Sequence, residues 1–350
     1  MPMLAEIVDV VIGIDTHKHT NTAAVVSAAT GAAIDDITAA TDPDGYSSLI
    51  ALADRSPGLR AWAIEGANSY GAGLARFLVE RGEWIIELDR PARAKRRHGA
   101  KSDPIDAVRA AREALAREHL SEPRAEGERA ALSVRLAARR LAVDSATDAQ
   151  RQIHALVVAA PEHLRSKLRD KTTPQMLMIC ARLRVDARWD LTTRETAKVL
   201  RCLARRATTL AAEAREHERA ILEIVRSWRP DILDNCGVGP IVAATVLCAW
   251  SHPGRIRNDA AFAMLAGTAP IPASSGMTVR YRLNRSGDRR LNQAIHTVVT
   301  TRMRVDPETK AYIERRRAEG KTDREIKRCL KRYVTRQLFR QLEHQPLDRT

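Results

Sequence analysis

The chain has 350 residues, 44% of them hydrophobic and only 4% aromatic, which suffices for two domains with mainly aliphatic cores. The 58 Lys and Arg residues exceed the 43 Asp and Glu residues and give a net charge of +15. This excess favours a polyanionic partner, nucleic acid first, because the planar Arg side chain pairs with phosphate. The alternative is that codon usage in a GC-rich genome sets the Arg content.

The cysteines and the apolar runs exclude several classes of protein. The five cysteines are widely spaced and contain no CxxC pair, which argues against a zinc ribbon or a redox motif. Their odd number and the missing signal peptide favour a reducing, cytoplasmic setting. The longest apolar run, residues 241–250, is shorter than the ~18 residues that a membrane span needs, so we expect no membrane partner.

The first 90 residues predict a mixed sheet with helices added late. The expected order is three strands, a helix, a strand, a helix and a strand, which suits an RNase H-like (RuvC-like) domain better than a doubly wound Rossmann sheet. From their hydrophobic patterns, we expect strands at residues 7–14, 22–27, 33–38, 59–65 and 83–88. Turn residues at 42–45 should lead into a short helix through Leu52, and a second helix is expected at 70–81. We assign residues 1–115 to this domain.

The remainder of the chain predicts helices. Ala-, Leu-, Arg- and Glu-rich segments at 104–120, 125–160 and 196–228 are typical of long exposed helices, with a coiled coil as one interpretation. We therefore assign residues 116–228 to a helical connector and dimerisation region. Residues 229–350 form a mainly helical C-terminal domain with a helix-hairpin-helix-like segment. The predicted fold class is α/β plus all-α.

Four acidic residues are candidate metal ligands. Asp15 and Glu65 each end an expected strand, and Asp103 and Asp106 are three apart and share a helix face. Converging carboxylates are what Mg²⁺ requires for phosphodiester chemistry. The alternatives are ordinary strand-end acids and a normal helix start, with Asp103 as N-cap. A basic run just before the helix favours the metal interpretation, since it attracts phosphate: Arg93, Lys95, Arg96, Arg97 and Lys101.

A glycine turn and a serine loop mark the C-terminal third. Gly237 and Gly239 precede an apolar helix, where backbone amides bind phosphate or where the turn simply lets helices pack. Ser274 and Ser275 lie in a loop with Pro and Gly on either side, where a serine is either a nucleophile or part of a flexible polar loop. Basic residues after this loop are candidate phosphate ligands: Arg280, Arg282, Arg285, Arg289 and Arg290.

The histidines show no metal-binding pattern. His17, His19, His98 and His252 are scattered, and the chain contains no HExxH motif. We interpret them as solvated side chains or neighbours of phosphate.

Several motifs together resemble a known family. Residues 13–18 (GIDTHK), 64–66 (IEG) and 101–107 (KSDPIDA) resemble the DEDD blocks of transposases of the insertion sequence 110 family, which includes pilin-inversion recombinases. Four further blocks resemble the C-terminal transposase domain of that family: residues 237–240 (GVGP), 266–270 (AGTAP), 275–276 (SG) and 285–291 (RSGDRRL). The resemblance covers nearly the whole chain.

The resemblance implies a RuvC-like domain that holds Mg²⁺ (or Mn²⁺) through Asp15, Glu65, Asp103 and Asp106. It also implies a nucleophilic serine that joins covalently to DNA. The matching residue is Ser275, and the adjacent Ser274 leaves the register open by one. Further implied partners are donor and target DNA, a structured guide RNA encoded by the element, and other copies of the chain in a dimer or tetramer.

The expected function is therefore a Mg²⁺-dependent DNA transposase or recombinase that works through a phosphoserine intermediate. One alternative is a metal-only RuvC-like nuclease, such as a junction resolvase, in which Ser275 has no chemical role. A second alternative is a protein that binds RNA or DNA without enzymatic activity.

Overall fold

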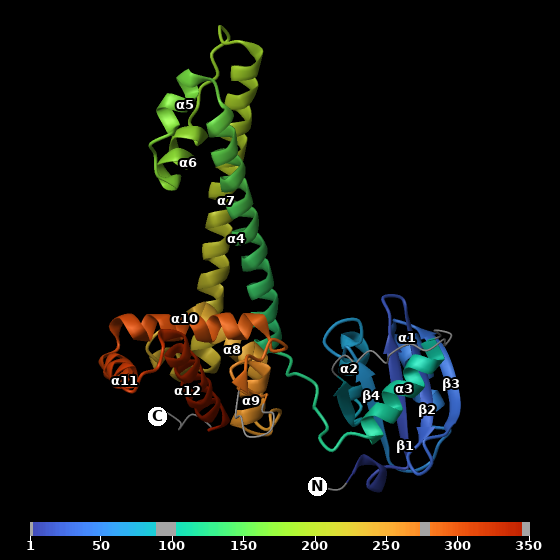
Figure 1. Ribbon diagram of the computed structural model, residues 1–350. Coiled ribbons are helices and arrows are strands. Elements are labelled where there is room, and N and C mark those ends of the chain that lie inside the picture. Colours follow the sequence, from blue (N-terminus) through green and yellow to red (C-terminus); the bar gives the residue numbers. More distant parts are fainter. Residues whose placement is uncertain (1–2, 89–102, 274–280, 345–350) are drawn as a thin grey trace. The chain divides into compact units, whose positions relative to one another are not determined.

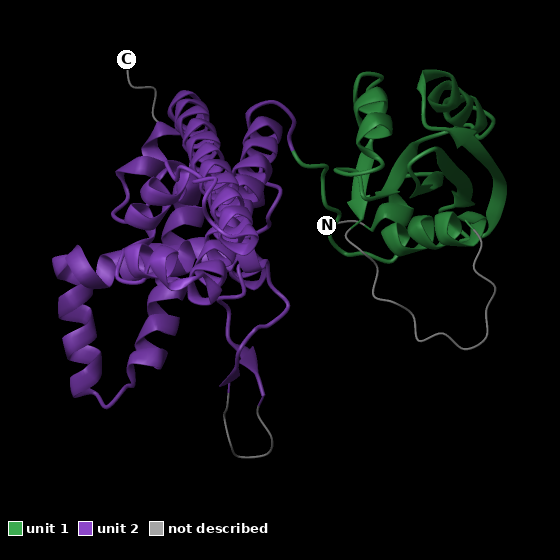
Figure 2. Cartoon of the chain, turned by 90° about the horizontal axis from the view of Figure 1, so that it is seen from above, with its two compact units in different colours: residues 1–124 green, residues 125–350 purple. Residues whose placement is uncertain are grey.

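The structure is a computed structural model that describes residues 3–88, 103–273 and 281–344. The chain divides into two compact units, residues 1–124 and 125–350, which are coloured separately in Figure 2. Each unit is described by itself below. None of the described helices is long and apolar enough to cross a membrane.

Unit 1 contains a five-stranded mixed sheet with strand order β3-β2-β1-β4-β5. Its strands are β1 (Val10–Thr16), β2 (Thr20–Ser27), β3 (Ala33–Ala40), β4 (Arg60–Glu65) and β5 (Ile85–Leu88). The strands β1, β2 and β3 pair antiparallel, whereas β4 runs parallel to both β1 and β5. The predicted mixed sheet is thus confirmed and is compatible with an RNase H-like core. The first strand begins later than predicted, because Leu4–Glu6 forms a 3₁₀ helix.

Alternating side chains of β1 build two apolar cores, one on each face of the sheet. Val10, Ile12 and Ile14 pack with α1 (Pro43–Ala53) and α2 (Ala72–Val79). Val11 faces the other side, where it packs with α3 (Asp103–Leu115). Figure 1 shows α3 across the sheet. The odd-numbered residues of β1 therefore face the helix that carries Asp103 and Asp106.

Gly13 lies where the backbone of α3 closely approaches the sheet. A Cβ atom at this position would lie 2.0 Å from the Ala107 carbonyl oxygen and 2.7 Å from the Ala111 nitrogen, both of them backbone atoms of α3. Only a residue without a side chain permits this contact. The contact brings the first turn of α3 next to the end of β1.

Two long helices of unit 2, α4 (Glu128–Ala159) and α7 (Leu191–Trp228), pack along each other. They run antiparallel, because Arg139 on α4 bonds Glu218 on α7 while Ile153 shares a core with Leu200. Small buried alanines line the contact, among them Ala146 and Ala207. Two short helices, α5 (Glu162–Leu168) and α6 (Thr173–Ala181), follow α4 and precede α7 in the sequence. The expected self-association through these helices stays a prediction.

The rest of unit 2 is a helical domain with one small sheet. Its core is built around large side chains including Trp250, Phe262 and Leu338. The sheet pairs β6 (Ile271–Pro272) with β7 (Tyr281–Arg282), and neither strand was predicted. The helices, shown in Figure 1, are α8 (Pro240–Trp250), α9 (Asp259–Leu265), α10 (Arg289–Val305), α11 (Pro307–Ala318) and α12 (Asp323–Glu343).

Candidate active site

The end of β1 places Asp15 on the face of the sheet that α3 covers. Val11, Gly13 and Asp15 alternate along the strand toward that helix. The same alternation in β4 puts Ala61 and Ala63 into the α3 core, so Glu65 follows them at the same face. Because β1 and β4 are parallel and Ile14 pairs with Ile64, both acids lie at the carboxyl ends of neighbouring strands.

The first turn of α3 brings further acids to this point. The helix begins at Asp103 and carries Asp106 in the same turn. The imidazole of His17 lies between two carboxylates, with Nε2 at 3.3 Å from Asp15 Oδ2 and 3.6 Å from Asp103 Oδ1. The His17 backbone N–H donates to the Thr20 carbonyl oxygen, which fixes the turn between β1 and β2.

Negative charge at this site is held at a cost in free energy. Burial raises the pKa of Asp15 above its usual value, the nearby His17 lowers it, and the charges of Asp106 and Asp103 raise it further. The Asp15 carboxylate is therefore less stable here than in water. A divalent cation would relieve both the burial and the mutual repulsion of the carboxylates.

The donor atoms fit a divalent cation. One ligand atom each from Asp15, His17 and Asp103 lies within 4.8 Å of the other two, and all three residues are partly or fully exposed. Oxygen donors suit Mg²⁺ and Mn²⁺, and imidazole adds a preference for Mn²⁺. Exposure leaves room for water and a phosphate oxygen to complete the coordination.

The two remaining candidate acids have other neighbours. The Asp106 carboxylate accepts a hydrogen bond of 2.6 Å from Arg109, although its charge still raises the pKa of Asp15. Glu65 ends β4, and its carbonyl oxygen accepts a 2.9 Å hydrogen bond from the Thr16 hydroxyl. Neither carboxylate belongs to the group of three closely spaced donors.

Sequence reasoning did not assign His17 to this group. The signal that identifies it is the period of a strand, since residues two apart point to the same face. His17 follows Asp15 by two positions and so continues toward α3. The two-residue spacing of Asp15 and His17 was not used in the prediction, because the histidines as a set are scattered along the chain.

Two sets of candidate residues lie outside the described parts of the chain. Ser274, Ser275 and Arg280 lie outside the described residues, between β6 and β7. The run before α3 also lies outside them, and comprises Arg93, Lys95, Arg96, Arg97 and Lys101.

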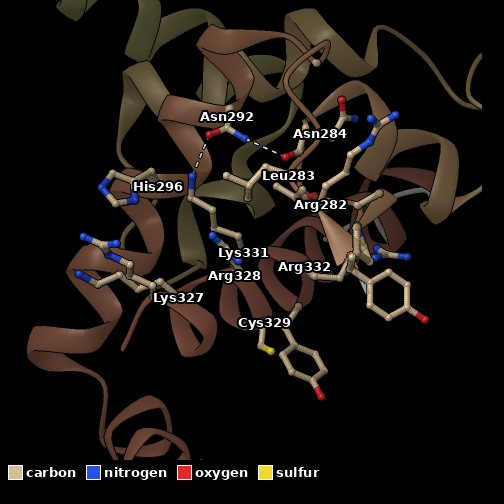
Figure 3. Close-up of a pocket in the computed structure, with 18 of the residues that line it drawn as sticks. Arg282, Leu283, Asn284, Asn292, His296, Lys327, Arg328, Cys329, Lys331 and Arg332 are labelled. Atoms are coloured by element: carbon tan, nitrogen blue, oxygen red, sulfur yellow. Dashed lines mark hydrogen bonds between the residues drawn. The ribbon is translucent and has the colours of Figure 1, made fainter. Parts of the chain in front are cut away.

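The other basic candidates lie around a cavity of unit 2. Arg282, Arg285 and Arg289 line a cavity of about 850 Å³ between the small sheet, α10 and α12, which we call the basic pocket (Figure 3). Arg290 is exposed on the first turn of α10 and is not part of the lining. The Asp288 side chain caps that helix by accepting from two backbone N–H groups.

The glycine turn before α8 supports close packing. Gly237 has a φ of +83°, and a Cβ there would lie 3.0 Å from the Val298 carbonyl oxygen of α10. Arg302 also donates to the Cys236 carbonyl oxygen, 2.9 Å away. Gly239 is exposed with open space around it and begins α8 as its N-cap. The structure thus explains Gly237 by packing, and a phosphate contact at Gly239 stays a prediction.

Comparison with known proteins yields matches in both units. Residues 12–160 match the DEDD transposase domain of the IS110 group, and residues 232–314 match the domain described as transposase IS116/IS110/IS902 family. A 42 kDa protein of insertion element IS900 from Mycobacterium paratuberculosis is 33% identical over 134 residues, which are 36% of this chain and 32% of that protein. A 43.6 kDa protein of insertion element IS110 from Streptomyces coelicolor is 34% identical over 87 residues, 25% and 22% of the two chains.

The alignments thus span a third or less of these relatives. The two domain matches include the acid site (Asp15, His17 and Asp103) and the part of the basic pocket that precedes residue 315. Two separate regions of the chain are therefore similar to the DEDD domain and to the C-terminal domain of IS110-family transposases.

Proposed function

We propose that the chain is a DNA transposase that cuts and rejoins DNA with the help of a divalent metal ion and a nucleophilic serine. The observation that carries this proposal is the convergence of Asp15, His17 and Asp103 at the end of β1. This arrangement, at the N-terminal turn of a helix packed on the sheet, suits binding of Mg²⁺ or Mn²⁺ next to a phosphodiester.

In the proposed site, Asp15 and Asp103 hold the metal, with His17 as a further donor and with Glu65 and Asp106 close by. When bound, the ion supplies positive charge that neutralises the scissile phosphate. Asp15 or a neighbouring acid of the site is also the proposed acceptor of the serine proton.

Ser275 is the proposed nucleophile. Its Oγ forms a bond to phosphorus while the bond from phosphorus to one bridging oxygen breaks, and that oxygen leaves as a DNA hydroxyl. The serine proton passes to a carboxylate such as Asp15, and the departing oxygen takes up a proton. The phosphoserine ester keeps the energy of the broken bond, so attack by a DNA hydroxyl rejoins a strand. Ser275 must reach the acids in the same chain or from another copy in a homo-oligomer.

The proposed partners are donor and target DNA, and a structured guide RNA that the family resemblance implies. The net charge of +15 supports nucleic-acid partners in general. Arg282, Arg285 and Arg289 on the rim of the basic pocket are proposed phosphate ligands.

Strand cleavage by the full-length chain tests this proposal. Using labelled DNA that carries the element's ends, we expect Asp15→Asn, Asp103→Asn and Ser275→Ala each to abolish cleavage, while Ser274→Ala retains it. Full cleavage by Ser275→Ala would instead identify a metal-only nuclease. If the Asp15→Ala, Asp103→Ala double variant keeps every DNA activity that the wild type shows, the chain binds nucleic acid without catalysis at these acids.

A further inference from the structure

The basic pocket of unit 2 gathers positive charge without compensation at its surface. Ten of its 23 lining residues are Lys or Arg, and none of the described residues that line it is Asp or Glu. Some of these cations form ion pairs with an acid that does not line the pocket. The Asp259 carboxylate accepts a hydrogen bond from Arg336 at 2.8 Å and lies 3.5 Å from Arg332. By contrast, Lys327 and Lys331 form no ion pair with a carboxylate of the described residues, although the charge of Lys327 acts on Asp323 one turn away.

Lys331 is a fixed cation in this pocket. Its Nζ donates to Asn292 Oδ1 at 2.8 Å (Figure 3). The Asn292 amide group in turn donates to the Ala266 carbonyl oxygen at 2.7 Å. Burial lowers the pKa of Lys331. An ammonium group has three donors, so two remain for a ligand. A bound anion would stabilise the charged form of Lys331, which burial disfavours.

Lys327 and Lys331 also act on the neighbouring His296. Burial lowers the pKa of His296, and the charges of Lys331 and Lys327 lower it further. Figure 3 shows these three side chains on neighbouring helices, α10 and α12. The positive potential that lowers the pKa of His296 also attracts a polyanion.

Tyrosines give the pocket a second chemical character. Three of the five tyrosines in the chain, Tyr281, Tyr312 and Tyr333, line it. Tyr281 is 62% and Tyr333 55% exposed, and the Tyr312 and Tyr333 rings meet edge to face at 5.8 Å. The Arg316 guanidinium lies 5.8 Å from the Tyr312 ring centre. Exposed rings among arginines are the combination on which unpaired bases stack while cations bind the phosphates.

The dimensions favour single strands over duplex. The volume of about 850 Å³ lies within the range of about 300–1,000 Å³ that is typical of small-molecule pockets, which suits individual nucleotides. Paired bases in a duplex cannot present their faces to a tyrosine ring. A cavity lined only by cations would not make this distinction.

We propose that the basic pocket binds an unpaired segment of nucleic acid, with bases against Tyr281 and Tyr333 and a phosphate at Lys331. This inference rests on the proposed function in taking nucleic acid as the partner, and it adds a single-strand site separate from the acid site. The shared chemistry of base and phosphate fits single-stranded DNA and RNA alike.

Binding of labelled oligonucleotides to the full-length protein, followed by fluorescence anisotropy without divalent metal, tests the proposal. The probes are a 12-mer of dT, a 12-mer of U and a blunt duplex. Because stacking of one base is worth about a tenfold change in affinity, we expect Tyr333→Ala to weaken binding of at least one single-stranded probe by that factor. Duplex binding should change by less than about twofold, as for an ordinary surface substitution.

Matched variants separate stacking from charge and from folding. Tyr333→Phe keeps the ring and should bind like the wild type. Trp84→Ala removes an aromatic side chain that is 37% exposed and precedes β5, at the opposite end of the sheet from Asp15, and should have no effect. Lys331→Gln should weaken both single-stranded probes, whereas Lys171→Gln, an exposed charge between α5 and α6, should not.

A loss with dT, with U or with both supports the pocket and identifies the strand it takes. The proposal is overturned if Tyr281→Ala and Tyr333→Ala both bind single strands like the wild type, or if they weaken duplex binding equally. This result is separable from the proposed function, because metal-dependent cleavage would still depend on Asp15. Conversely, cleavage that survives Asp15→Asn would refute the transposase chemistry and leave these binding results unchanged.

Discussion

The acid site of unit 1 and the basic pocket of unit 2 both gather like charges, but they hold them in different ways. Asp15 is a short side chain, 17% exposed, on a central strand against which α3 packs through backbone contacts at Gly13. Half of the ten cations that line the basic pocket are exposed, and the other half are partly buried, among them Lys331, which donates the hydrogen bond to Asn292 described above.

This contrast matches two kinds of counter-charge. A divalent ion needs ligands at nearly constant distances, so its carboxylates belong on rigid elements. A nucleic-acid strand varies in shape, and long cationic side chains adapt to it. We therefore expect changes at the acid site to abolish chemistry, and changes at the pocket to alter affinity in a graded way.

The largest effect is expected from the central ligand. Asp15→Asn should lower the rate of strand cleavage by at least about 100-fold, since it removes the charge that holds the stabilising cation. Single-turnover cleavage of labelled DNA measures this effect. Asp36→Asn, an exposed acid on β3, is the control and should cleave normally. A cleavage rate for Asp15→Asn close to that of Asp36→Asn would break the distinction between the two regions.

Next in size is the packing contact that carries the acid site. Gly13→Ala should lower the free energy of unfolding of unit 1 by about 1–3 kcal/mol, because the new methyl group overlaps the backbone of α3. It should also weaken Mn²⁺ binding by moving Asp103 away from Asp15. Urea unfolding and calorimetric titration measure both effects.

Gly239→Ala is the control for that glycine, since the space around Gly239 is open and its φ of −93° is negative. It should lower the free energy of unfolding by no more than about 1 kcal/mol, because Ala is a weaker N-cap residue than Gly, and it should leave Mn²⁺ binding unchanged. Wild-type stability of Gly13→Ala would show that α3 does not need its close approach to β1.

A smaller effect is expected for the imidazole. His17→Gln should weaken Mn²⁺ binding by about tenfold, as loss of one supporting donor does, and Mg²⁺ binding by less, since imidazole suits Mn²⁺ better. His19→Gln, two residues further and exposed, should bind both ions normally. Tighter Mn²⁺ binding by His17→Gln would mean that the histidine occupies the cation position instead of serving as a ligand.

The smallest effect concerns salt. Arg282→Gln should reduce the slope of log affinity against log salt for a single strand by about 0.7, the value for one phosphate contact. Asp15→Asn should leave this slope unchanged in metal-free buffer. Anisotropy titrations between 50 and about 200 mM salt resolve the difference. Equal slopes for wild type and Arg282→Gln would remove Arg282 from the set of phosphate ligands.

The order of elements in unit 1 could be predicted because its strands carry strong hydrophobic runs. The prediction also identified Asp15 and Glu65 as strand ends. It did not show that α3 packs against β1 at Gly13. The sequence Asp103-Pro104-Ile105-Asp106 predicts a helix start, but the same sequence pattern occurs in helices that do not pack on a sheet. Only the packing shows that Asp103 approaches Asp15 through His17.

The basic pocket was beyond prediction for a different reason. Its lining comes from residues 267–270, 281–296 and 312–336, and nothing in the spacing of Tyr281, Tyr312 and Tyr333 indicates that they meet. Local charge alone was enough to predict the arginines after β7 as phosphate ligands, which stays a prediction. The cavity and its aromatic lining depend on how α10, α11 and α12 pack.

The most direct test of the central claim is to trap the full-length protein on labelled DNA during turnover and to map the attached residue by mass spectrometry. The account predicts an adduct at Ser275 that forms with Mg²⁺ or Mn²⁺ and is absent in the Asp15→Asn variant. DNA cleavage under these conditions without any covalent adduct would contradict the account and favour a nuclease that uses the metal alone.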